Sequence, residues 1–468
     1  MNMTDDSWRI DWKGVRIHLV AVGGIGMSAL ARIAAAKGAV VSGCDSSESG
    51  TLAELRSSGC ECFVGHSPGH LEAADLVVYS SAVPRDNPEL AAAAARGIEA
   101  ISRGRMLARL TEGHDTVAVS GAHGKTSTTW LVANMLIRCG MDPSVAVGGI
   151  VADLGGNWRV GEGSSFVTEA DESDGSFLFL APRYPVITNI DADHLDHYSG
   201  LDEIKRAFAK FAEATGDGAV IACADCPNVR DVLGGVGARK MTFGTERGDV
   251  RAENIRLEPG RAVYDARLPA GTERDIVLSM PGIHNVRNSL AALALAVELG
   301  LPIDGVRDAF ANASLVGRRL ERRGSVRGVT VYDDYAHHPA EISATLEAAR
   351  MLSRGRLVGI FQPHRYTRTL HLHREFGPVF DRLDLLLLAP IYAASEPPIE
   401  GVTSELIARE IEELGAVRCE LVPDLGPLPE RLASELAPGD MLITLGAGDV
   451  WQVGDSVLRL LTAQASAA

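Results

Sequence analysis

The heptapeptide GAHGKTS, at residues 121–127, combines the residue types that bind the phosphates of a nucleotide. Gly121 and Gly124 have no Cβ, so backbone N–H groups beside them can approach phosphate oxygens closely. Lys125 supplies a positive charge for the β- and γ-phosphates, and the hydroxyl of Thr126 is a ligand for Mg²⁺. The heptapeptide therefore predicts a site for a nucleoside triphosphate.

The flanking sequence predicts the strand and the helix that would position this loop. Residues 116–119 form a β-type apolar run, and residues from about 128 to 137 have a helical pattern. A helix that starts here directs the positive end of its dipole toward a bound anion. Val119 stands where the strict pattern G-x-x-x-x-G-K-[ST] has its first glycine. The alternative is an ordinary glycine-rich turn with a surface lysine; the strand and helix favour the phosphate loop.

Two later strands of the same region end in acidic sequences. The strand at 166–168 runs into EADESD at 169–174, and the strand at 186–190 runs into DADHLDH at 191–197. Four carboxylates within six residues repel one another unless a cation is present. A solvated acidic loop is the alternative interpretation. The nearby phosphate loop favours Mg²⁺, which takes hard oxygen ligands beside phosphate.

The N-terminal sequence predicts a second nucleotide-binding element. A strand at 15–22 leads through the turn GGIGM, at 23–27, into an apolar helix, and a strand at 40–44 ends at Asp45. Such a βαβ unit holds a pyrophosphate at the start of its helix. Ala21 replaces the first glycine of G-x-G-x-x-G, and Asp45 lies about 20 residues on, where a ribose-binding acid is expected. This unit suits NAD or another nucleoside diphosphate equally.

The alternation of strands and helices predicts an α/β fold with mainly parallel sheets. A length of 468 residues suggests three domains at roughly 150 residues each. We expect an N-terminal Rossmann-like domain at residues 1–112, a central P-loop ATPase-type domain at 113–315 and a C-terminal Rossmann-like domain at 316–468.

The composition indicates which partners are excluded and in which cell compartment the protein is expected. A net charge of −16 and an aromatic content of 5% argue against binding of nucleic acid or of anionic membranes. The N-terminus has no apolar core of a signal peptide, and no apolar run approaches the roughly 18 residues of a membrane span. We expect a cytoplasmic protein with reduced thiols, in which Cys223 and Cys226 are structural despite their C-x-x-C spacing.

Eight motifs occur in a specific order along nearly the whole chain: VGGIGM, SSAVPRDNPEL, GAHGKTS, EADESDGSFL, NIDADHLDHY, HNVRNSL, VYDDYAHHP and FQPHRYTRT. With this set the chain resembles the Mur ligases of bacterial cell-wall synthesis. The resemblance implies ATP-dependent formation of an amide bond between L-alanine and the lactate carboxylate of UDP-N-acetylmuramate. It further implies an acyl-phosphate intermediate, ATP and Mg²⁺ as cofactors, a role in peptidoglycan precursor synthesis, and a monomer or weak homodimer.

The resemblance also assigns residues to each ligand. For the UDP-sugar it implies Gly23, Gly24, Ile25, Gly26, Met27, Ser46, His66, Ser81 and Asn87. For ATP it implies Gly121, His123, Gly124, Lys125, Thr126, Ser127, His284, Asn285, Asn288, Arg319, Asp334 and His338. The implied metal ligands are Thr126, Glu169 and His194, and the implied catalytic residues are Lys125, Glu169, His194, His364, Arg365 and Arg368. The third domain would carry L-alanine, with His364 as a candidate base and Arg365 or Arg368 holding the alanine carboxylate. From the residues alone, His284, Asn285 and Asn288 can equally be helix caps.

The sequence departs from the family pattern at several positions. Ala21 and Ala122 replace a glycine and a threonine that are usual in the family. Before Arg319 the family usually has an aromatic residue and a glycine, where this chain has Ala313 and Leu315. Pro390 and Ser395 replace an aspartate and a glycine. Sister ligases carry a carbamylated lysine at the position of Phe208. Lys205 and Lys210 are out of phase on the helix, so we expect no carbamylated lysine.

Other functions remain open at this stage. A second ligase of the same superfamily would join another amino acid or a peptide. A nicotinamide-dependent oxidoreductase would use the N-terminal unit but would leave GAHGKTS and EADESD without a role. A catalytically silent nucleotide-binding regulator would be expected to have lost the motif residues that are present here. The choice among L-alanine, glycine and L-serine depends on differences of one or two atoms.

Overall fold

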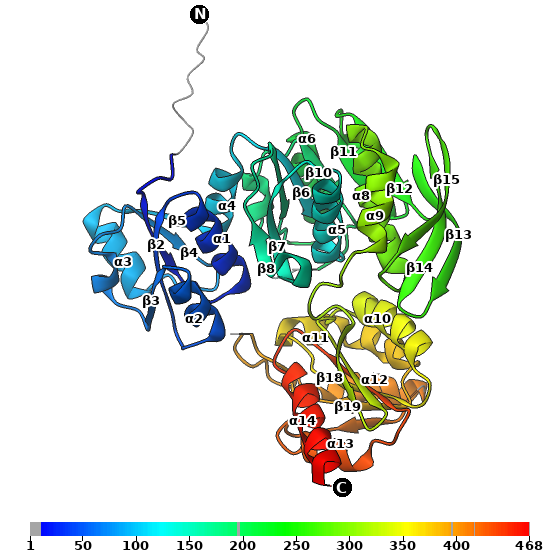
Figure 1. The fold of residues 1–468 in the computed structure, drawn as a ribbon. Coiled ribbons are helices and arrows are strands. Elements are labelled where there is room, and N and C mark those ends of the chain that lie inside the picture. Colours follow the sequence, from blue (N-terminus) through cyan, green and yellow to red (C-terminus); the bar gives the residue numbers. More distant parts are fainter. Residues whose placement is uncertain (1–10, 194–196, 395, 416, 468) are drawn as a thin grey trace, which may run out of the picture. The chain divides into compact units, whose positions relative to one another are not determined.

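The computed structural model describes residues 11–193, 197–394, 396–415 and 417–467 (Figure 1). These residues form three β-sheets flanked by helices. One compact unit contains the first sheet and most of the second; the other contains the third sheet and the short segments 256–263 and 278–286, which include parts of β13 to β15. The predicted three-domain α/β class with mainly parallel sheets is confirmed; the boundaries at 112 and 315 stay predictions.

The N-terminal sheet is parallel, in the order β3-β2-β1-β4-β5. Apolar residues of α1, α2 and α4 cover one face of this sheet, and residues of η2 and α3 cover the other. The elements are β1 (Arg16–Val20), α1 (Ile25–Ala36), β2 (Val40–Asp45), α2 (Gly50–Ser57), β3 (Glu61–Val64), η2 (Pro68–Leu71), β4 (Leu76–Tyr79), α3 (Pro88–Arg96), β5 (Glu99–Ser102) and α4 (Arg103–Thr111).

The central sheet has the order β15-β14-β13-β12-β11-β10-β6-β9-β7-β8. Strand β6 pairs in parallel with both β9 and β10, so the carboxyl ends of these three strands meet at one edge, where open α/β sheets bind ligands. The elements are β6 (Asp115–Ser120), α5 (Lys125–Arg138), β7 (Ser144–Val151), η3 (Ala152–Leu154), β8 (Gly156–Arg159), β9 (Ser165–Glu169), η4 (Ser176–Phe179), β10 (Tyr184–Ile187), α6 (Leu201–Glu213), β11 (Val220–Cys223), α7 (Pro227–Gly235), β12 (Lys240–Gly244), β13 (Val250–Glu258), β14 (Arg261–Leu268), β15 (Gly271–Leu278), α8 (Ile283–Leu299) and α9 (Ile303–Ala311).

The third sheet has the order β16-β17-β21-β18-β19-β20, and only the β16–β17 pair among the described residues is antiparallel. One face packs on α10, α11 and α12, the other on α13 and α14. The elements are β16 (Glu321–Val326), β17 (Val329–Asp334), α10 (Pro339–Leu352), β18 (Leu357–Phe361), α11 (Tyr366–Phe376), η5 (Gly377–Phe380), β19 (Leu385–Leu388), α12 (Glu405–Leu414), β20 (Cys419–Leu421), α13 (Leu428–Glu435), β21 (Met441–Leu445) and α14 (Trp451–Ala467).

The structure corrects several predicted element bounds. The helix after the phosphate loop begins at Lys125, one turn earlier than predicted. The first strand ends at Val20, and β10 ends at Ile187, because glycine-rich and polar turns follow them sooner than the apolar pattern suggests. Three successive strands, β13 to β15, were not predicted, because they are half exposed and carry many charged residues. Among the described residues, no helix has the length and apolar character to cross a membrane.

Ala21, where the family has glycine, lies in the turn after β1 with φ at +65°, in the left-handed region. An alanine in this region costs about 1–2 kcal/mol, whereas glycine loses about 0.5–1 kcal/mol more chain entropy on folding. We therefore expect Ala21→Gly to raise the free energy of unfolding by up to about 1 kcal/mol, as measured by urea unfolding. The matched substitution Ala91→Gly, inside helix α3, should lower it by about 1 kcal/mol. A destabilised Ala21→Gly variant would contradict the strained turn.

Candidate active site

Two glycines of the phosphate loop occupy positions that admit no side chain. Gly121 has φ at +141°, and a Cβ there would overlap the hydroxyl of Thr188. Gly124 has φ at +81°, and a Cβ there would lie 2.7 Å from Oδ1 of Asn288. Both the backbone conformation and the close neighbours therefore require glycine.

Two residues after β10 hold the phosphate loop in place. Thr188 Oγ1 donates a hydrogen bond to the carbonyl oxygen of His123 at 2.7 Å, and Asn189 Nδ2 donates to the same oxygen at 2.9 Å. The backbone N–H of His123 donates in return to Asn189 Oδ1 at 2.9 Å. The loop is thus preorganised by a neighbouring strand end, a role that the sequence did not assign to these two residues.

Lys125 is the first residue of α5 and is largely buried. Its Nζ donates to the carbonyl oxygen of Gly121 and to Oε1 of Glu172, both at 2.7 Å. The Lys125 and Glu172 side chains are 17% and 4% exposed. Burial lowers the pKa of Lys125, but the carboxylates of Glu172 and Asp171 outweigh it and raise this pKa to about 12. Lys125 is therefore a permanent positive charge beneath the loop.

The acidic sequence after β9 surrounds this lysine. Tyr198 Oη donates to the backbone oxygen of Glu172 at 2.6 Å, which fixes that residue beside Lys125. Asp171 pairs with Arg103 of α4 at 3.1 Å. Burial alone would raise the pKa of Asp171, but the positive charges of Lys125 and Arg103 outweigh burial, so this pKa lies below its usual value. The Asp171 carboxylate stays ionised, and both carboxylates lie at the same sheet edge as the phosphate loop.

The predicted metal ligands fit this edge. Glu169 ends β9, and its Oε1 accepts a hydrogen bond from the backbone N–H of Gly148 at 2.6 Å. A Cβ at Gly148 would overlap this carboxylate. Thr126 is buried in the first turn of α5. Carboxylate and hydroxyl oxygens are the ligands that Mg²⁺ prefers, so the described residues suit that ion. His194, the third predicted ligand, lies outside the described residues, as does Ser395.

Phe208 stands where sister ligases carry the carbamylated lysine, and its side chain is 1% exposed. Lys205, one of the two nearby lysines, pairs with Asp231 at 2.9 Å. That no carbamylated lysine forms stays a prediction. A small cavity of about 10 Å³ adjoins Phe208 and is lined by Ala122, Glu172, Asp191, Asp193, Tyr198, Ile204 and Phe208.

The predicted adenine contacts lie in the first turns of α8. Asn288 is 8% exposed, and its Oδ1 faces Gly124 of the phosphate loop. Asn285 is buried, and its Nδ2 donates to the carbonyl oxygen of Pro281 at 2.7 Å. His284 is the second residue of the helix. Contact with adenine stays a prediction for all three residues.

The predicted pyrophosphate turn of the N-terminal domain is braced by Asp45. Oδ2 of Asp45 accepts a hydrogen bond from the backbone N–H of Gly23 at 2.9 Å, and a Cβ at Gly23 would lie 2.8 Å from that oxygen. The other oxygen, Oδ1, accepts from the backbone N–H of Ser46 at 2.8 Å. Gly24 precedes α1 as its N-cap, and Met27 is buried in the first turn of that helix, at 2% exposure.

The remaining residues predicted for the UDP-sugar have mixed surroundings. Asn87 is buried, and its Oδ1 caps α3 by accepting from the backbone N–H of Glu89 at 2.9 Å. His66 Nδ1 lies 3.1 Å from Oε2 of Glu89. Ser81 and Ile25 are exposed beside the turns that follow β4 and β1, and Gly26 approaches the side chain of Arg103. Contact with the UDP-sugar stays a prediction for each of them.

In the third domain, Asp334 ends β17 and is 4% exposed. Its oxygens accept hydrogen bonds from the backbone N–H groups of Leu320 at 2.7 Å and Ala336 at 2.8 Å. Burial nevertheless raises the pKa of Asp334 to about 6. Arg319 stacks on the ring of Tyr335 at 5.5 Å.

His338 begins α10 as its N-cap, and Arg319 Nη1 lies 3.8 Å from the carboxylate of Glu341 in the first turn of that helix. Arg319, Asp334 and His338, which were predicted for ATP, are thus neighbours at the β17–α10 junction.

The three predicted catalytic residues of this domain gather at the start of α11. Nη1 of Arg368 lies 3.3 Å from Nδ1 of His364. The two side chains are therefore neighbours at this position. Arg365 has φ at +73°, and its Nη1 lies 3.7 Å from Oε1 of Glu396. Left-handed backbone at a non-glycine residue is typical of ligand clamps. The His364 ring stacks on Tyr392.

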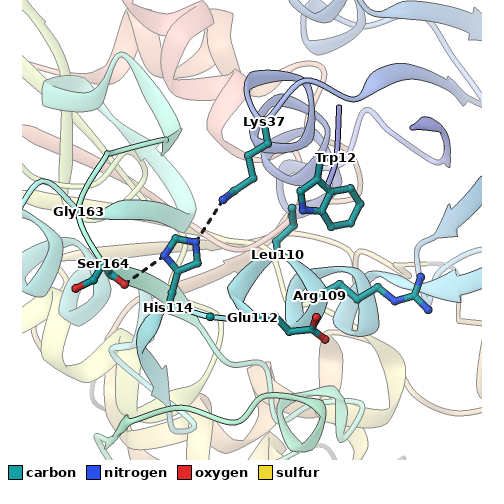
Figure 2. Close-up of a pocket in the computed structure, with 9 residues that line it drawn as sticks. Trp12, Lys37, Arg109, Leu110, Glu112, His114, Gly163 and Ser164 are labelled. Carbon is teal, nitrogen blue, oxygen red and sulfur yellow. Dashed lines mark hydrogen bonds between the residues drawn. The ribbon is translucent and has the colours of Figure 1, made fainter. Parts of the chain in front are cut away.

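A cavity of about 300 Å³ contains none of the predicted site residues (Figure 2). It is lined by Trp12, Lys37, Arg109, Leu110, Glu112, Gly113, His114, Gly163 and Ser164. Figure 2 shows Lys37 Nζ directed at His114 Nε2, 3.3 Å away. Burial lowers the pKa of Lys37. This cavity is therefore separate from the predicted site residues at the sheet edge.

Two glycines that flank α5 allow steric overlap to be separated from backbone strain. Gly140, past the end of α5, has φ at +79°, close to that of Gly124, but nothing lies within 4 Å of a Cβ built there. Gly140→Ala should cost about 1–2 kcal/mol through its backbone alone. Gly124→Ala should cost at least about 1 kcal/mol more, because its Cβ meets Asn288. Urea unfolding measures both, and equal costs would contradict the close packing of the loop.

Three family models match the chain in succession. They are "Mur ligase family, catalytic domain" at residues 16–115, "Mur ligase middle domain" at 119–296 and "Mur ligase, glutamate ligase domain" at 318–448. Together they cover the three sheets. The domains predicted from the motifs correspond to these matches in number and order.

Known proteins resemble the chain over nearly its full length. A UDP-N-acetylmuramate–L-alanine ligase of Geobacter sp. (strain M21) is 46% identical over 451 residues, which is 96% of this chain and 98% of the relative. The solved UDP-N-acetylmuramate–alanine ligase of Thermotoga maritima has a TM-score of 0.82 at 29% identity, covering 96% of this chain and 99% of that one. A murein peptide ligase of Psychrobacter arcticus has a TM-score of 0.73 at 25% identity, covering 96% and 99%. The chain belongs to the Mur ligase family.

Proposed function

We propose that this chain is an ATP-dependent ligase that joins L-alanine to the lactate carboxylate of UDP-N-acetylmuramate, with release of ADP and phosphate. The observation that carries the proposal is the buried Lys125–Glu172 pair beneath a phosphate loop at the carboxyl ends of β6 and β9. The 46% identity to a UDP-N-acetylmuramate–L-alanine ligase supports the choice of substrates. The reaction belongs to peptidoglycan precursor synthesis and therefore to cell-wall biogenesis, cell shape and cell division.

In the first step, an oxygen of the lactate carboxylate attacks the γ-phosphorus of ATP, and ADP leaves. Two anions must approach each other, so positive charge is needed where the phosphoryl group transfers. Lys125 supplies it, and backbone N–H groups of residues 121–127 hold the phosphate oxygens. Glu172 stabilises the charged lysine in its buried position until phosphate arrives.

Thr126, Glu169 and, by resemblance, His194 would hold Mg²⁺ at this site. The ion would supply further neutralisation of the phosphate charge when bound.

In the second step, the amine of L-alanine attacks the acyl carbon, the amide bond forms and phosphate leaves. The attacking amine must lose a proton, and His364 is the candidate base that accepts it. Arg365 and Arg368 provide guanidinium groups for the alanine carboxylate. The proposed small-molecule partners are ATP, UDP-N-acetylmuramate and L-alanine. We expect the reaction to take place in the cytoplasm.

Phosphate release from purified protein tests this function. We expect release only when ATP, UDP-N-acetylmuramate and L-alanine are all present with Mg²⁺. Glycine and L-serine in place of L-alanine measure specificity, and a peptide in place of the amino acid tests the murein peptide ligase alternative. Release that depends on the peptide and not on L-alanine would overturn the proposal. An NADH-binding assay on the same sample tests the oxidoreductase alternative.

Lys125→Ala removes the positive charge beneath the phosphate loop. We expect kcat/KM to fall by about 10²–10³ or more, because a preorganised charge at the transferring group is lost. The matched control is Lys205→Ala on α6, since that lysine pairs with the exposed Asp231 of α7. The control should stay within about twofold of the parent, and near-normal turnover of Lys125→Ala would refute the loop's role.

Arg365→Lys keeps a positive charge but removes the planar fork that binds a carboxylate. We expect KM for L-alanine to rise by at least about tenfold, while KM for ATP changes by less than about threefold. Arg409→Lys is the control, because that side chain is 69% exposed on α12. A parallel rise in both KM values would contradict the assignment of Arg365 to the amino acid.

A further inference from the structure

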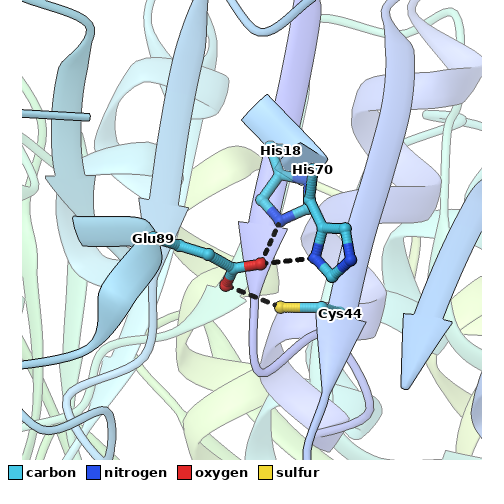
Figure 3. A group of neighbouring side chains, drawn as sticks. All are labelled: His18, Cys44, His70 and Glu89. Carbon is cyan, nitrogen blue, oxygen red and sulfur yellow. Dashed lines mark hydrogen bonds and ion pairs between the residues drawn. The ribbon is translucent and has the colours of Figure 1, made fainter. Parts of the chain in front are cut away.

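Four potential metal ligands meet in the N-terminal domain, on the sheet face covered by η2 and α3 (Figure 3). They are His18 on β1, Cys44 on β2, His70 on η2 and Glu89 on α3. One ligand atom from each lies within 4.8 Å of the others. Elements distant in sequence therefore place an N₂SO set of donors at one point.

This cluster is buried among apolar residues. The side chains of His18 and Glu89 are 0% exposed, that of His70 is 16% exposed, and Cys44 is completely buried. Oε1 of Glu89 lies 2.6 Å from His70 Nδ1 and 3.5 Å from His18 Nε2, and Oε2 accepts from Cys44 Sγ at 2.9 Å. A carboxylate and two imidazoles are costly to place in an apolar layer without a function or a bound partner.

Contacts outside the cluster fix the two imidazole rings. Nδ1 of His18 lies 2.9 Å from the hydroxyl of Ser42, which leaves Nε2 directed at the cluster. The His70 ring stacks on Phe63, with centroids 4.1 Å apart and planes 5° apart. Metal-binding histidines are commonly oriented by such second contacts.

We propose that His18 Nε2, Cys44 Sγ, His70 Nδ1 and one carboxylate oxygen of Glu89 bind a zinc ion or a metal ion of similar class. Thiolate and imidazole ligands select zinc-class ions over Mg²⁺. Bond lengths of about 2.0–2.3 Å in a tetrahedral site would set the ligand atoms about 3.3–3.8 Å apart, so the cluster opens by up to about 1 Å on binding. Thiolate and carboxylate together balance the charge of the ion, which suits a buried position. Binding releases the proton of the Cys44 thiol to solvent.

His66 connects this cluster to solvent. Its Nδ1 lies 3.1 Å from Glu89 Oε2 and 3.2 Å from Cys44 Sγ, and its side chain is 27% exposed. An ion can therefore enter beside His66 without unfolding the domain. The site is distinct from the proposed Mg²⁺ site, which belongs to the central sheet and contains no thiol. The competing explanation is a network of hydrogen bonds centred on Glu89 that binds no metal.

Cobalt titration of the full chain distinguishes the two explanations. Protein freed of metal with a chelator is titrated with Co²⁺ in excess Mg²⁺, which occupies oxygen-rich sites. We expect one Co²⁺ per chain, with a thiolate-to-cobalt charge-transfer band that Zn²⁺ abolishes by displacement. Zn²⁺ should also raise the melting temperature by a few degrees. Absence of the band in the parent protein would overturn the proposal.

Variants locate the binding to this cluster. Cys44→Ser keeps a hydroxyl donor for Glu89 but should abolish the charge-transfer band and weaken Zn²⁺ binding by at least about 100-fold. Cys60→Ser is the control, because it makes the same substitution at another buried cysteine of the domain. It should leave the charge-transfer band and the Zn²⁺ affinity unchanged. His70→Asn, outside the proposed substrate sites, should weaken Zn²⁺ binding similarly and serves if Cys44→Ser fails to fold. An unchanged band in Cys44→Ser, or an unchanged Zn²⁺ affinity in His70→Asn, would refute the site.

Discussion

The ion pair between Lys125 and Glu172 is the interaction on which the candidate active site depends. A lysine held under a phosphate loop is buried, and an unpaired buried charge would shift its pKa and lose its proton. Glu172 and its acidic neighbours prevent that and raise the pKa of Lys125 to about 12. Because the pair is nearly closed to water, an arriving phosphate meets a lysine whose hydration has already been removed. The charge is therefore preorganised for an anion before any ligand binds.

Close backbone packing is the second constraint, and it recurs in both nucleotide-binding turns. In the central sheet, Gly121 and Gly124 leave no room for a Cβ against Thr188 and Asn288. In the N-terminal sheet, Gly23 packs on the carboxylate of Asp45, which accepts its N–H. Both turns lie at the carboxyl ends of parallel strands, so sheet topology brings the loops to the ligand edge and glycine lets them close.

The sequence predicted the strands and helices that carry the motifs, because apolar runs and glycine turns are local signals. It also predicted an Mg²⁺ site at the acidic residues after β9, because they follow a strand in the domain that holds the phosphate loop. It did not predict that Thr188 and Asn189 hold the loop, because these contacts join residues about 65 positions apart. The sequence placed Asp45 where a ribose-binding acid is expected, whereas its carboxylate braces the glycine turn.

The third domain also contains contacts that local sequence patterns do not show. Asp334, Arg319 and His338 were grouped only through resemblance, yet they lie together because β17 ends where α10 begins. The pKa of Asp334, raised to about 6 by burial, depends on packing that no local pattern expresses. Strands β13 to β15 were missed for a different reason. Their exposed, charged positions hide the alternation that marks a strand.

The central claim is that phosphate from ATP is first transferred to a carboxylate and then displaced by an amine. Oxygen tracing tests it most directly. UDP-N-acetylmuramate labelled with ¹⁸O in its lactate carboxylate is incubated with the protein, ATP and L-alanine, and the released phosphate is analysed by mass spectrometry. The account predicts one ¹⁸O atom in each phosphate released from fully labelled substrate, since the carboxylate oxygen stays with phosphorus when the acyl bond breaks. Phosphate without the label would contradict it.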